Sequence, residues 1–250
     1  MDDSDDRFLE VGRTLTEILY RHGLTDDASL LDVGCSVGRL PIALLTFTGY
    51  GGHYTGFDVT PKQVSWARRT LTPVSANLRF RHLDVRNARY NPRGAVEPDD
   101  VRFPAKAESQ DMACLFSIFT HFYRNDIQVY LHELRRVLKP GGTVVASWFV
   151  YDDERYDAAV SSIYPMIHRL DEHTIYSDQD DPLRAIAFHE DLIRSMVETA
   201  GLELELIERG TWAGGPGPDF QDIVVLRRPP LTTLQRLRRR AGATRRRVLR

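Results

Sequence analysis

Cysteine is scarce in this sequence: Cys35 and Cys114 are the only two in 250 residues. A secreted domain stapled by disulfides needs a denser set, so the pair argues against a disulfide framework and favours a reduced, cytoplasmic setting. Both residues fall in apolar segments typical of buried strands, where a thiol stays protonated and is a poor nucleophile. We therefore predict no cysteine chemistry.

Long apolar runs are also missing. No stretch reaches the roughly 20 apolar residues that cross a membrane. Residues 2–6 read Asp-Asp-Ser-Asp-Asp, the opposite of the basic start of a signal peptide. The sequence contains no internal repeat, and His168, His173 and the aspartates at 178–181 match no compact spacing of metal ligands. We expect a protein without a bound metal.

Acidic residues are absent from residues 227–250, which contain ten arginines. The other 226 residues hold 23 basic and 35 acidic side chains, a net charge of −12. With 42% hydrophobic residues, the chain is long enough for one α/β domain with a full core. We place that domain at residues 1–228 and a basic tail at residues 229–250.

The basic tail allows more than one interpretation. Leu231, Leu234 and Leu237 recur every three residues among the arginines, as in a basic amphipathic helix on an anionic membrane surface. The same charge suits a phosphate-rich polymer. The prolines at 229–230 and Gly242 equally fit a solvated tail without regular structure.

The stretch Ser29–Leu40 predicts a strand, a tight loop and a helix, because an apolar run breaks at a glycine-bearing turn and resumes at helical spacing. Gly34 and Gly38 remove side chains where the backbone turns sharply and a ligand approaches it. The helix that follows would begin with free N–H groups and its positive dipole end. This pattern is typical of a nucleotide cradle.

The same loop narrows the choice of nucleotide. A dinucleotide fingerprint needs glycine where this chain has Ser36 and Arg39, which argues against NAD or FAD. Asp32, just before the loop, would repel a pyrophosphate but suits a cationic ligand such as S-adenosylmethionine (SAM), with its sulfonium and amino groups. Residues 31–39 resemble motif I of the class I SAM-dependent methyltransferases, with Ser36 where that family usually has glycine.

This resemblance implies a fold and a cofactor. The fold is a Rossmann-like α/β sandwich, with a seven-stranded, mostly parallel sheet, helices on both faces and a final antiparallel strand, over residues 8–228. The cofactor is SAM, bound across the ends of the first three strands. The residues expected to hold it are Asp32, Gly34, Cys35, Gly38, Asp58, Asp84, Val85 and Ser117.

Asp58 ends the predicted strand 54–58, 20 residues beyond Gly38, about the spacing at which an acidic side chain accepts hydrogen bonds from ribose hydroxyls. It also fits the N-cap of the predicted helix 61–71, in which we expect Trp66 to be a core residue.

Asp84 ends the third predicted strand, residues 78–85. The resemblance implies that its carboxylate accepts from the adenine amino group while the backbone amide of Val85 contacts the ring. The alternative is a turn-forming aspartate before Asn87.

Residues 87–110 are too broken by proline and glycine for a helix, and longer than an ordinary connection. Such an excursion would rise from the ligand-binding edge of the sheet, so Tyr90, Asn91 and Arg93 are candidate substrate contacts. A loop without a binding role fits equally well.

The apolar strand 111–117 leads to His121, and the segment resembles the motif IV of small-molecule methyltransferases. An imidazole titrates near neutral pH, so His121 is the candidate general base for an attacking hydroxyl. A structural histidine is the alternative. Residues 133–142 resemble the motif that follows in the same family.

The C-terminal part predicts a strand at 143–149, a helix at 187–200, and strands at 202–207 and 221–226. Between them, residues 152–188 are poorly patterned and suggest a lid rather than more sheet. Four further residues are candidate substrate contacts: Trp148, Tyr151, His189 and Asp222.

Together these features favour SAM-dependent O-methylation of a small molecule, because the elaborated loops suggest a covered pocket and this branch of the family acts on bacterial sugars and natural products. A sugar hydroxyl is the first choice of acceptor, and another natural product, methylated on oxygen or nitrogen, is the alternative. No Asn/Asp-Pro-Pro-Tyr motif supports nucleic acid as acceptor. A non-catalytic SAM-binding module with a nucleic-acid- or membrane-binding tail is the rival from another class, but it would have no need of Asp32, Asp58 and Asp84.

Overall fold

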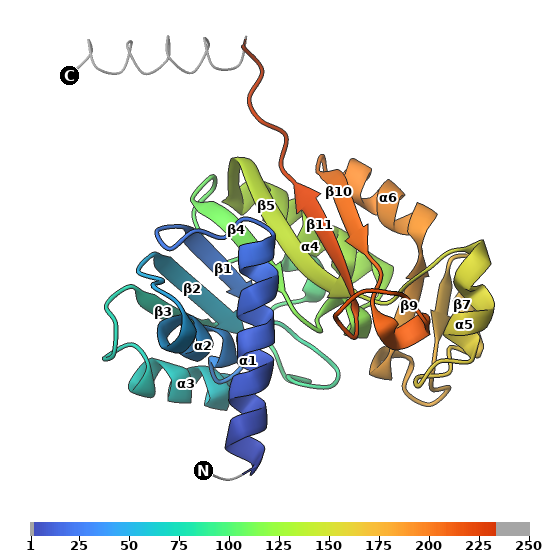
Figure 1. The fold of residues 1–250 in the computed structure, drawn as a ribbon, viewed down its shortest axis with the longest axis horizontal. Helices are drawn as coiled ribbons and strands as arrows, with labels where there is room; N and C mark the ends of the chain where they lie inside the picture. Colours follow the sequence, from blue (N-terminus) through green and yellow to red (C-terminus); the bar gives the residue numbers. More distant parts are fainter. Residues whose placement is uncertain (1–2, 234–250) are drawn as a thin grey trace.

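The computed structural model describes residues 3–233, and the segment that contains Leu234 and Leu237 of the predicted tail helix lies outside the described residues. A seven-stranded sheet forms its centre (Figure 1). In spatial order its strands are β10 (Glu203–Glu208), β11 (Asp222–Arg227), β5 (Leu138–Trp148), β4 (Gln110–Leu115), β1 (Ser29–Val33), β2 (His53–Asp58) and β3 (Leu78–His82). Strands β5, β4, β1, β2 and β3 pair in parallel, and β11 runs antiparallel to both β5 and β10. The predicted sheet, with its final antiparallel strand, is confirmed.

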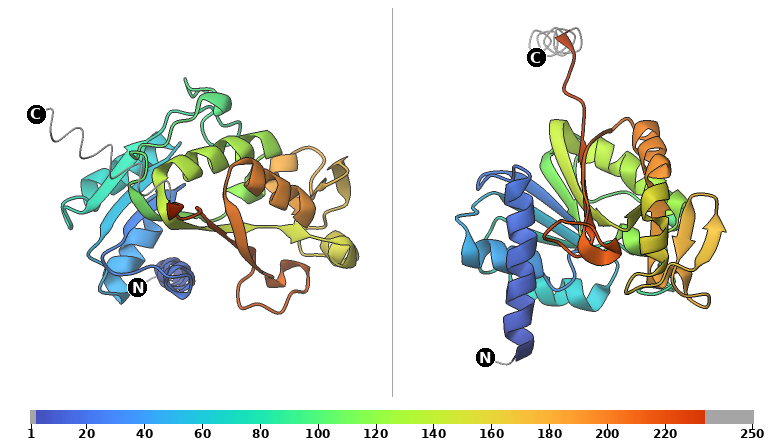
Figure 2. Two further views of the ribbon diagram at one scale, coloured as in Figure 1. Left: turned by 90° about the horizontal axis from the view of Figure 1, so that it is seen from above. Right: turned by 45° about the vertical axis from the view of Figure 1, so that its right-hand side comes forward.

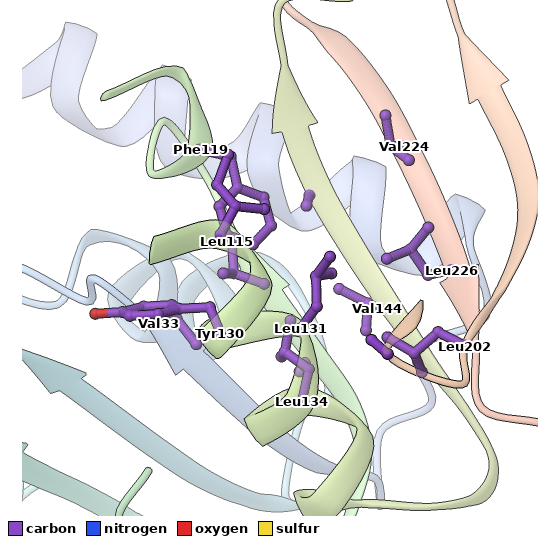
Figure 3. Packing of buried hydrophobic residues seen from close by; sticks show 14 of the residues in the cluster. Val33, Leu115, Phe119, Tyr130, Leu131, Leu134, Val144, Leu202, Val224 and Leu226 are labelled. Atoms are coloured by element: carbon purple, nitrogen blue, oxygen red, sulfur yellow. The ribbon is translucent and has the colours of Figure 1, made fainter. Parts of the chain in front are cut away.

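Helices cover both faces of this sheet (Figure 2). One face carries α1 (Asp3–Arg21), α2 (Arg39–Phe47) and α3 (Pro61–Thr70), and the other carries α4 (Arg124–Val137) and α6 (Glu190–Thr199). Strand alternation builds both cores. In β1, Leu30 packs with the first group of helices, whereas Leu31 and Val33 pack with the second. Figure 3 shows Leu131 and Leu134 of α4 directed at this second core.

Two expectations about these elements were wrong. Trp66 of α3 is 41% exposed and lies on the solvent side of its helix, so it is not a core residue. Strand β5 begins at Leu138, not at Thr143. Its pairing with β4 starts at Leu138, is interrupted by a register shift, and resumes at Thr143. Gly141, with φ of +85°, lies within this irregular stretch.

A second, four-stranded sheet forms a lobe at one end of the molecule (Figure 1). Its strands, in spatial order, are β6 (Val150–Tyr151), β9 (Ile186–His189), β8 (Thr174–Tyr176) and β7 (His168–Asp171), and α5 (Tyr156–Val160) lies between β6 and β7 in the chain. The lobe has its own small core around Phe149, Ile175 and Trp212. The prediction that residues 152–188 add no further sheet was therefore wrong. In the part of the chain that the structure covers, no helix is both long and apolar enough to span a membrane.

Candidate functional site

The loop between β1 and α2 is held against β2 by its backbone. The amides of Gly34 and Cys35 both donate to the carbonyl oxygen of Phe57, at 2.8 and 3.0 Å. Gly34 has φ of +80°, and a Cβ there would lie 2.2 Å from Cδ1 of Ile118. The missing side chain therefore permits the positive φ of this turn and leaves room for Ile118 to pack against it.

Asp58 joins the loop to the start of α3. Its Oδ2 accepts from the backbone amide of Ser36 at 2.9 Å, and its Oδ1 accepts from the amide of Thr60 at 2.8 Å. Thr60, and not Asp58, is the N-cap of α3, although Asp58 binds its amide. Each carboxylate oxygen retains acceptor capacity, so this geometry leaves the expected ribose contact available.

Asp32 is almost fully buried at the end of β1. The hydroxyl of Tyr54 donates to its Oδ2 at 2.6 Å, and Sγ of Cys114 lies 3.6 Å from its Oδ1. Burial raises the pKa of Asp32 to about 6, although both hydrogen bonds oppose the shift. Burial also raises the pKa of the Cys35 and Cys114 thiols, as expected for inert cysteines.

Three neighbouring cavities open at this edge of the sheet. The cradle cavity, about 400 Å³, is lined by Gly34, Ser36, Asp58 and residues from η2 (Phe119–His121) and its surroundings. The α1 cavity, about 230 Å³, lies between the loop and α1 and includes Asp32. The lobe cavity, about 390 Å³, lies between α1, the lobe and the segment before β11.

Two residues at the end of β4, Phe116 and Ser117, line all three cavities. Ser117 has φ of +55°, its amide donates to Oγ of Ser147 at 2.7 Å, and its hydroxyl donates to Oε1 of Gln221 at 3.0 Å. These contacts hold a strained residue where the cavities meet, and such strain is concentrated at functional sites. Ser117, predicted to bind the cofactor, therefore lies at the junction.

His121 lines both the cradle cavity and the lobe cavity. Its Nδ1 lies 2.8 Å from the carbonyl oxygen of Leu183, and a carbonyl can only accept, so Nδ1 carries the proton. In the neutral ring Nε2 then presents a lone pair. Burial lowers the pKa of His121, and the hydrogen bond to Leu183 only partly offsets this, so the ring is neutral at pH 7. This is the state that a general base needs.

The three predicted substrate contacts in the loop after β3 differ in where the structure places them. Tyr90 lines the cradle cavity, beside Asn87. Asn91 instead stabilises the loop, because its side-chain amide donates to Oδ1 of Asp84 at 2.9 Å and to the carbonyl of Val85 at 3.0 Å. Arg93 is exposed and lines none of the three cavities. Among these candidates, the structure brings only Tyr90 to the site.

The pair predicted to contact adenine lies beside the cradle cavity and not in its lining. Asp84 is exposed, and its hydrogen bond from Asn91 lowers its pKa. Val85 is buried in the core, and its amide donates to the carbonyl of Leu83 at 2.8 Å. The amide is thus already used within the loop.

Four predicted substrate contacts have structural roles in the main core, in the lobe or between them. Trp148 is fully buried between Phe119 and Phe188, and Tyr151 is buried against His189. None of Trp148, Tyr151, His189 and Asp222 lines the three cavities. The structure does not bring them to these cavities, and their contact with substrate stays a prediction.

His189 and Asp222 each have a definite structural role. The His189 side chain caps α6 by accepting from the amide of Asp191. Asp222 accepts from the amides of Val150 and Gly210 at 2.6 and 2.8 Å, and from Nε1 of Trp212 at 2.6 Å. Its carboxylate therefore joins β6 and the segment before β11 to the main sheet.

Several lining residues escaped the sequence analysis. Phe116, Tyr164 and Gln221 line the lobe cavity although they are far apart in the chain, and Val11 and Leu15 of α1 complete its wall. Only Phe116 had a local signal, its position at the end of a buried strand. In the described part of the chain, no group of three or more His, Cys, Asp or Glu residues could hold a metal ion.

Comparison with known proteins agrees with this geometry. Residues 30–142 match a family model described as a methyltransferase domain. The structure matches one chain from the structure of a complex between the Haloferax volcanii Trm112 methyltransferase activator and a putative methyltransferase. The TM-score is 0.59 and the identity 19%, and the match covers 91% of this chain and 95% of that chain. The chain has a Rossmann-like α/β methyltransferase fold. The family match supports the class I SAM-dependent methyltransferases, and similar solved structures include one with bound SAM, which supports SAM as the cofactor.

Two curated relatives match this chain over only part of their own length. The chain is 31% identical over 133 residues to a 2-methyl-6-phytyl-1,4-hydroquinone methyltransferase of Synechocystis, covering 53% of this chain and 36% of that protein. It is 22% identical over 148 residues to the sterol 4-C-methyltransferase strm-1 of Caenorhabditis elegans, covering 59% of this chain and 39% of that protein. The methyltransferase match thus spans well under half the length of these relatives.

Proposed function

We propose that this protein transfers a methyl group from SAM to a hydroxyl group of a small molecule with an apolar body. The observation that carries the proposal is the position of His121, which lines the cradle cavity and the lobe cavity and has its Nδ1 fixed by Leu183. A base at this junction can reach a group in one cavity while it reacts with a group in the other.

The residues of the cradle suit SAM. Gly34 lines the cradle cavity, where a ligand would meet its backbone, and Asp58 offers carboxylate oxygens to ribose hydroxyls. The buried Asp32 suits a positively charged group, and such a charge would favour the ionised carboxylate. When bound, SAM supplies an activated methyl carbon on its sulfonium sulfur.

His121 would then accept a proton. Nε2, free of hydrogen bonds to described residues, would take the proton of the acceptor hydroxyl. The chemistry that SAM would supply is a methyl carbon whose bond to sulfur breaks, leaving a neutral thioether, as the acceptor oxygen bonds to it. The hydrogen bond from Nδ1 to Leu183 stabilises the resulting imidazolium. Ser117 and Phe116 line the place where the two ligands would meet.

The lobe cavity favours an acceptor with an apolar body over the sugar that the sequence suggested. Its walls are largely apolar side chains, among them Leu15, Ile18, Phe116, Phe149 and Phe220. The named relatives act on sterols and a phytyl hydroquinone, which agrees with this character. A few polar groups, including Gln221 and Tyr164, would orient the hydroxyl.

The test combines binding with turnover. Calorimetry should show SAM binding by the wild-type protein, and methyl-labelled SAM should label members of a panel of phenols, hydroquinones and sterols more readily than simple sugars. NMR of the product distinguishes O-methylation from methylation at carbon. SAM binding without labelling of any panel member or cell extract would favour the non-catalytic binding module. Preferential labelling of sugars would favour the sugar hydroxyl as acceptor.

A further inference from the structure

Arg39, the first residue of α2, is fixed by contacts with α1. It lines both the cradle cavity and the α1 cavity. Its guanidinium lies over the ring of Phe8, 5.0 Å from the centroid. A Cβ added to Gly12 would lie 3.3 Å from Cγ of Arg39 and 2.9 Å from Cβ of Ala43, so the absent side chain lets α1 pack closely over the Arg39 stem. Its position therefore depends on α1.

The charge of Arg39 has no protein partner among residues 3–233, where it forms no ion pair. Desolvation lowers its pKa and no carboxylate counters the effect. In contrast, carboxylates raise the pKa of Arg21 and of Arg227. A cation thus lines two neighbouring cavities without a carboxylate in ion-pair contact with it.

The α1 cavity pairs this cation with the carboxylate of Asp32, which lines the same space. Free amino acids carry the complementary pair, an ammonium and a carboxylate, and SAM ends in such a group. Because Asp32 is buried and Arg39 borders the loop, an amino-acid end placed here would meet one opposite charge at each of its two ionic groups.

We propose that Arg39 binds the carboxylate of SAM and so makes the protein selective for SAM over its decarboxylated form. This inference rests on SAM binding as proposed above. Arg39 presents planar donors that match a carboxylate, and Phe8 limits the directions in which they point. Helix α1 is thereby part of the cofactor site. Apolar residues recur along α1 at three- and four-residue spacing, at Phe8, Val11, Leu15, Ile18 and Leu19, a pattern that fits both packing on the sheet and covering the cofactor.

The experiment uses two ligands that differ by one group, S-adenosylhomocysteine and its decarboxylated analogue, measured by calorimetry on the full chain. Wild-type protein should bind the first about 10–100-fold more tightly, the range expected for a hydrogen-bonded charge pair. Arg39→Met should weaken the binding of S-adenosylhomocysteine by a similar factor and leave the affinity for the decarboxylated analogue within twofold of the wild-type value. Arg39→Lys should retain part of the preference. Arg13→Met is the matched control. The guanidinium of Arg13, in α1, also lies over an aromatic ring, that of Phe47, but Arg13 lines none of the three cavities.

Each outcome decides between defined alternatives. Equal weakening of both ligands by Arg39→Met, or no weakening of either, overturns the inference. Equal affinity of the wild-type protein for the two ligands overturns it even if the variants do not fold. Failure of the wild-type protein to bind either ligand overturns the proposed SAM site itself, which is a different result.

Discussion

The backbone amide of Ser36 donates a hydrogen bond to Oδ2 of Asp58 at 2.9 Å, so one carboxylate fixes the cradle loop from the end of the neighbouring strand. The other oxygen of Asp58 binds the amide of Thr60 at the start of α3. The group expected to bind a ribose is therefore already oriented by the protein, and a ligand need not order it.

Replacing Asp58 should separate these two roles. We expect Asp58→Ala to weaken SAM binding by about 1–3 kcal/mol, because a half-buried acceptor of ligand hydrogen bonds is lost. Calorimetry gives the affinity and thermal denaturation gives the stability. A lowered melting temperature with unchanged affinity would show that Asp58 serves only the loop and the helix start. Asp26→Ala is the control, because Asp26 precedes the first residue of β1 and lines none of the three cavities.

Ser36→Gly tests the strain in the loop. Ser36 has φ of +51°, a conformation that destabilises the folded state by about 1–2 kcal/mol for a non-glycine residue. Glycine relieves this strain, but it also increases the entropy of the unfolded chain, which lowers stability by about 0.4–1 kcal/mol. We expect the free energy of unfolding to rise by about 0.5 kcal/mol in urea denaturation. Ser117→Gly is the matched comparison, since Ser117 also has positive φ but donates to Gln221, and it should lose stability. A loss of stability in Ser36→Gly would mean that its side chain contributes to the loop.

His121→Ala should preserve SAM binding while turnover falls by about 10²–10⁴, the usual contribution of a general base. Because burial lowers the pKa of His121 below its ordinary value of 6.5, wild-type kcat should stay level around neutrality and fall only at lower pH, as the base becomes protonated. Rates with labelled SAM across pH 5–8 check this. A variant that keeps nearly full rate at every pH would make His121 structural.

Asp222→Asn should destabilise the protein by about 1–3 kcal/mol at pH 7, because an amide cannot accept from all three donors that the carboxylate satisfies. Burial raises the pKa of Asp222 to about 6, above the usual 3.8, so the folded protein holds this proton more tightly than the unfolded chain. The free energy of unfolding should therefore decrease as pH rises from about 4 to 6. Urea denaturation across this range should show a smaller decrease in the variant, with Asp32 still contributing in both proteins.

Deleting residues 229–250 should leave folding and SAM affinity intact. The last contacts that tie the preceding segment to the domain include those of Arg228, which donates to the carbonyl of Leu138 and to Glu108. We propose that the removed arginines bind anionic surfaces, so binding to anionic liposomes or to nucleic acid at low salt should fall on truncation and be weak at high salt. Loss of folding or of SAM binding would place the domain boundary further along the chain.

The cradle could be predicted because its determinants are local. Gly34, Asp32 and Asp58 lie at fixed distances from the ends of apolar strands, and the strand order brings those ends together. His121 was predictable for the same reason, since it follows β4 closely. Its hydrogen bond to Leu183 was not, because the two residues are 62 positions apart.

The lobe could not be predicted because its strands have only two to four residues, too few for a period to show. The turn between β7 and β8 is tight, and its sequence lacks the glycine that usually signals a hairpin. The structural role of Asp222 could not be predicted for a different reason. Its carboxylate accepts from backbone and indole donors that are distant from it in the chain and that the sequence does not show.

Where the chain enters and leaves the lobe has a consequence for evolution. Val150 and Tyr151 pair in parallel with Phe188 and His189, so the two ends of the inserted segment lie side by side at the rim of the main sheet. A segment with adjacent ends can be exchanged, lengthened or reshaped without displacing the strands on either side. Residues from this segment, Tyr164 and Arg184, line the lobe cavity, whereas Gly34 and Asp58 belong to the sheet edge. Descendants of such a scaffold can thus acquire new acceptors through one contiguous segment while they inherit the cradle unchanged.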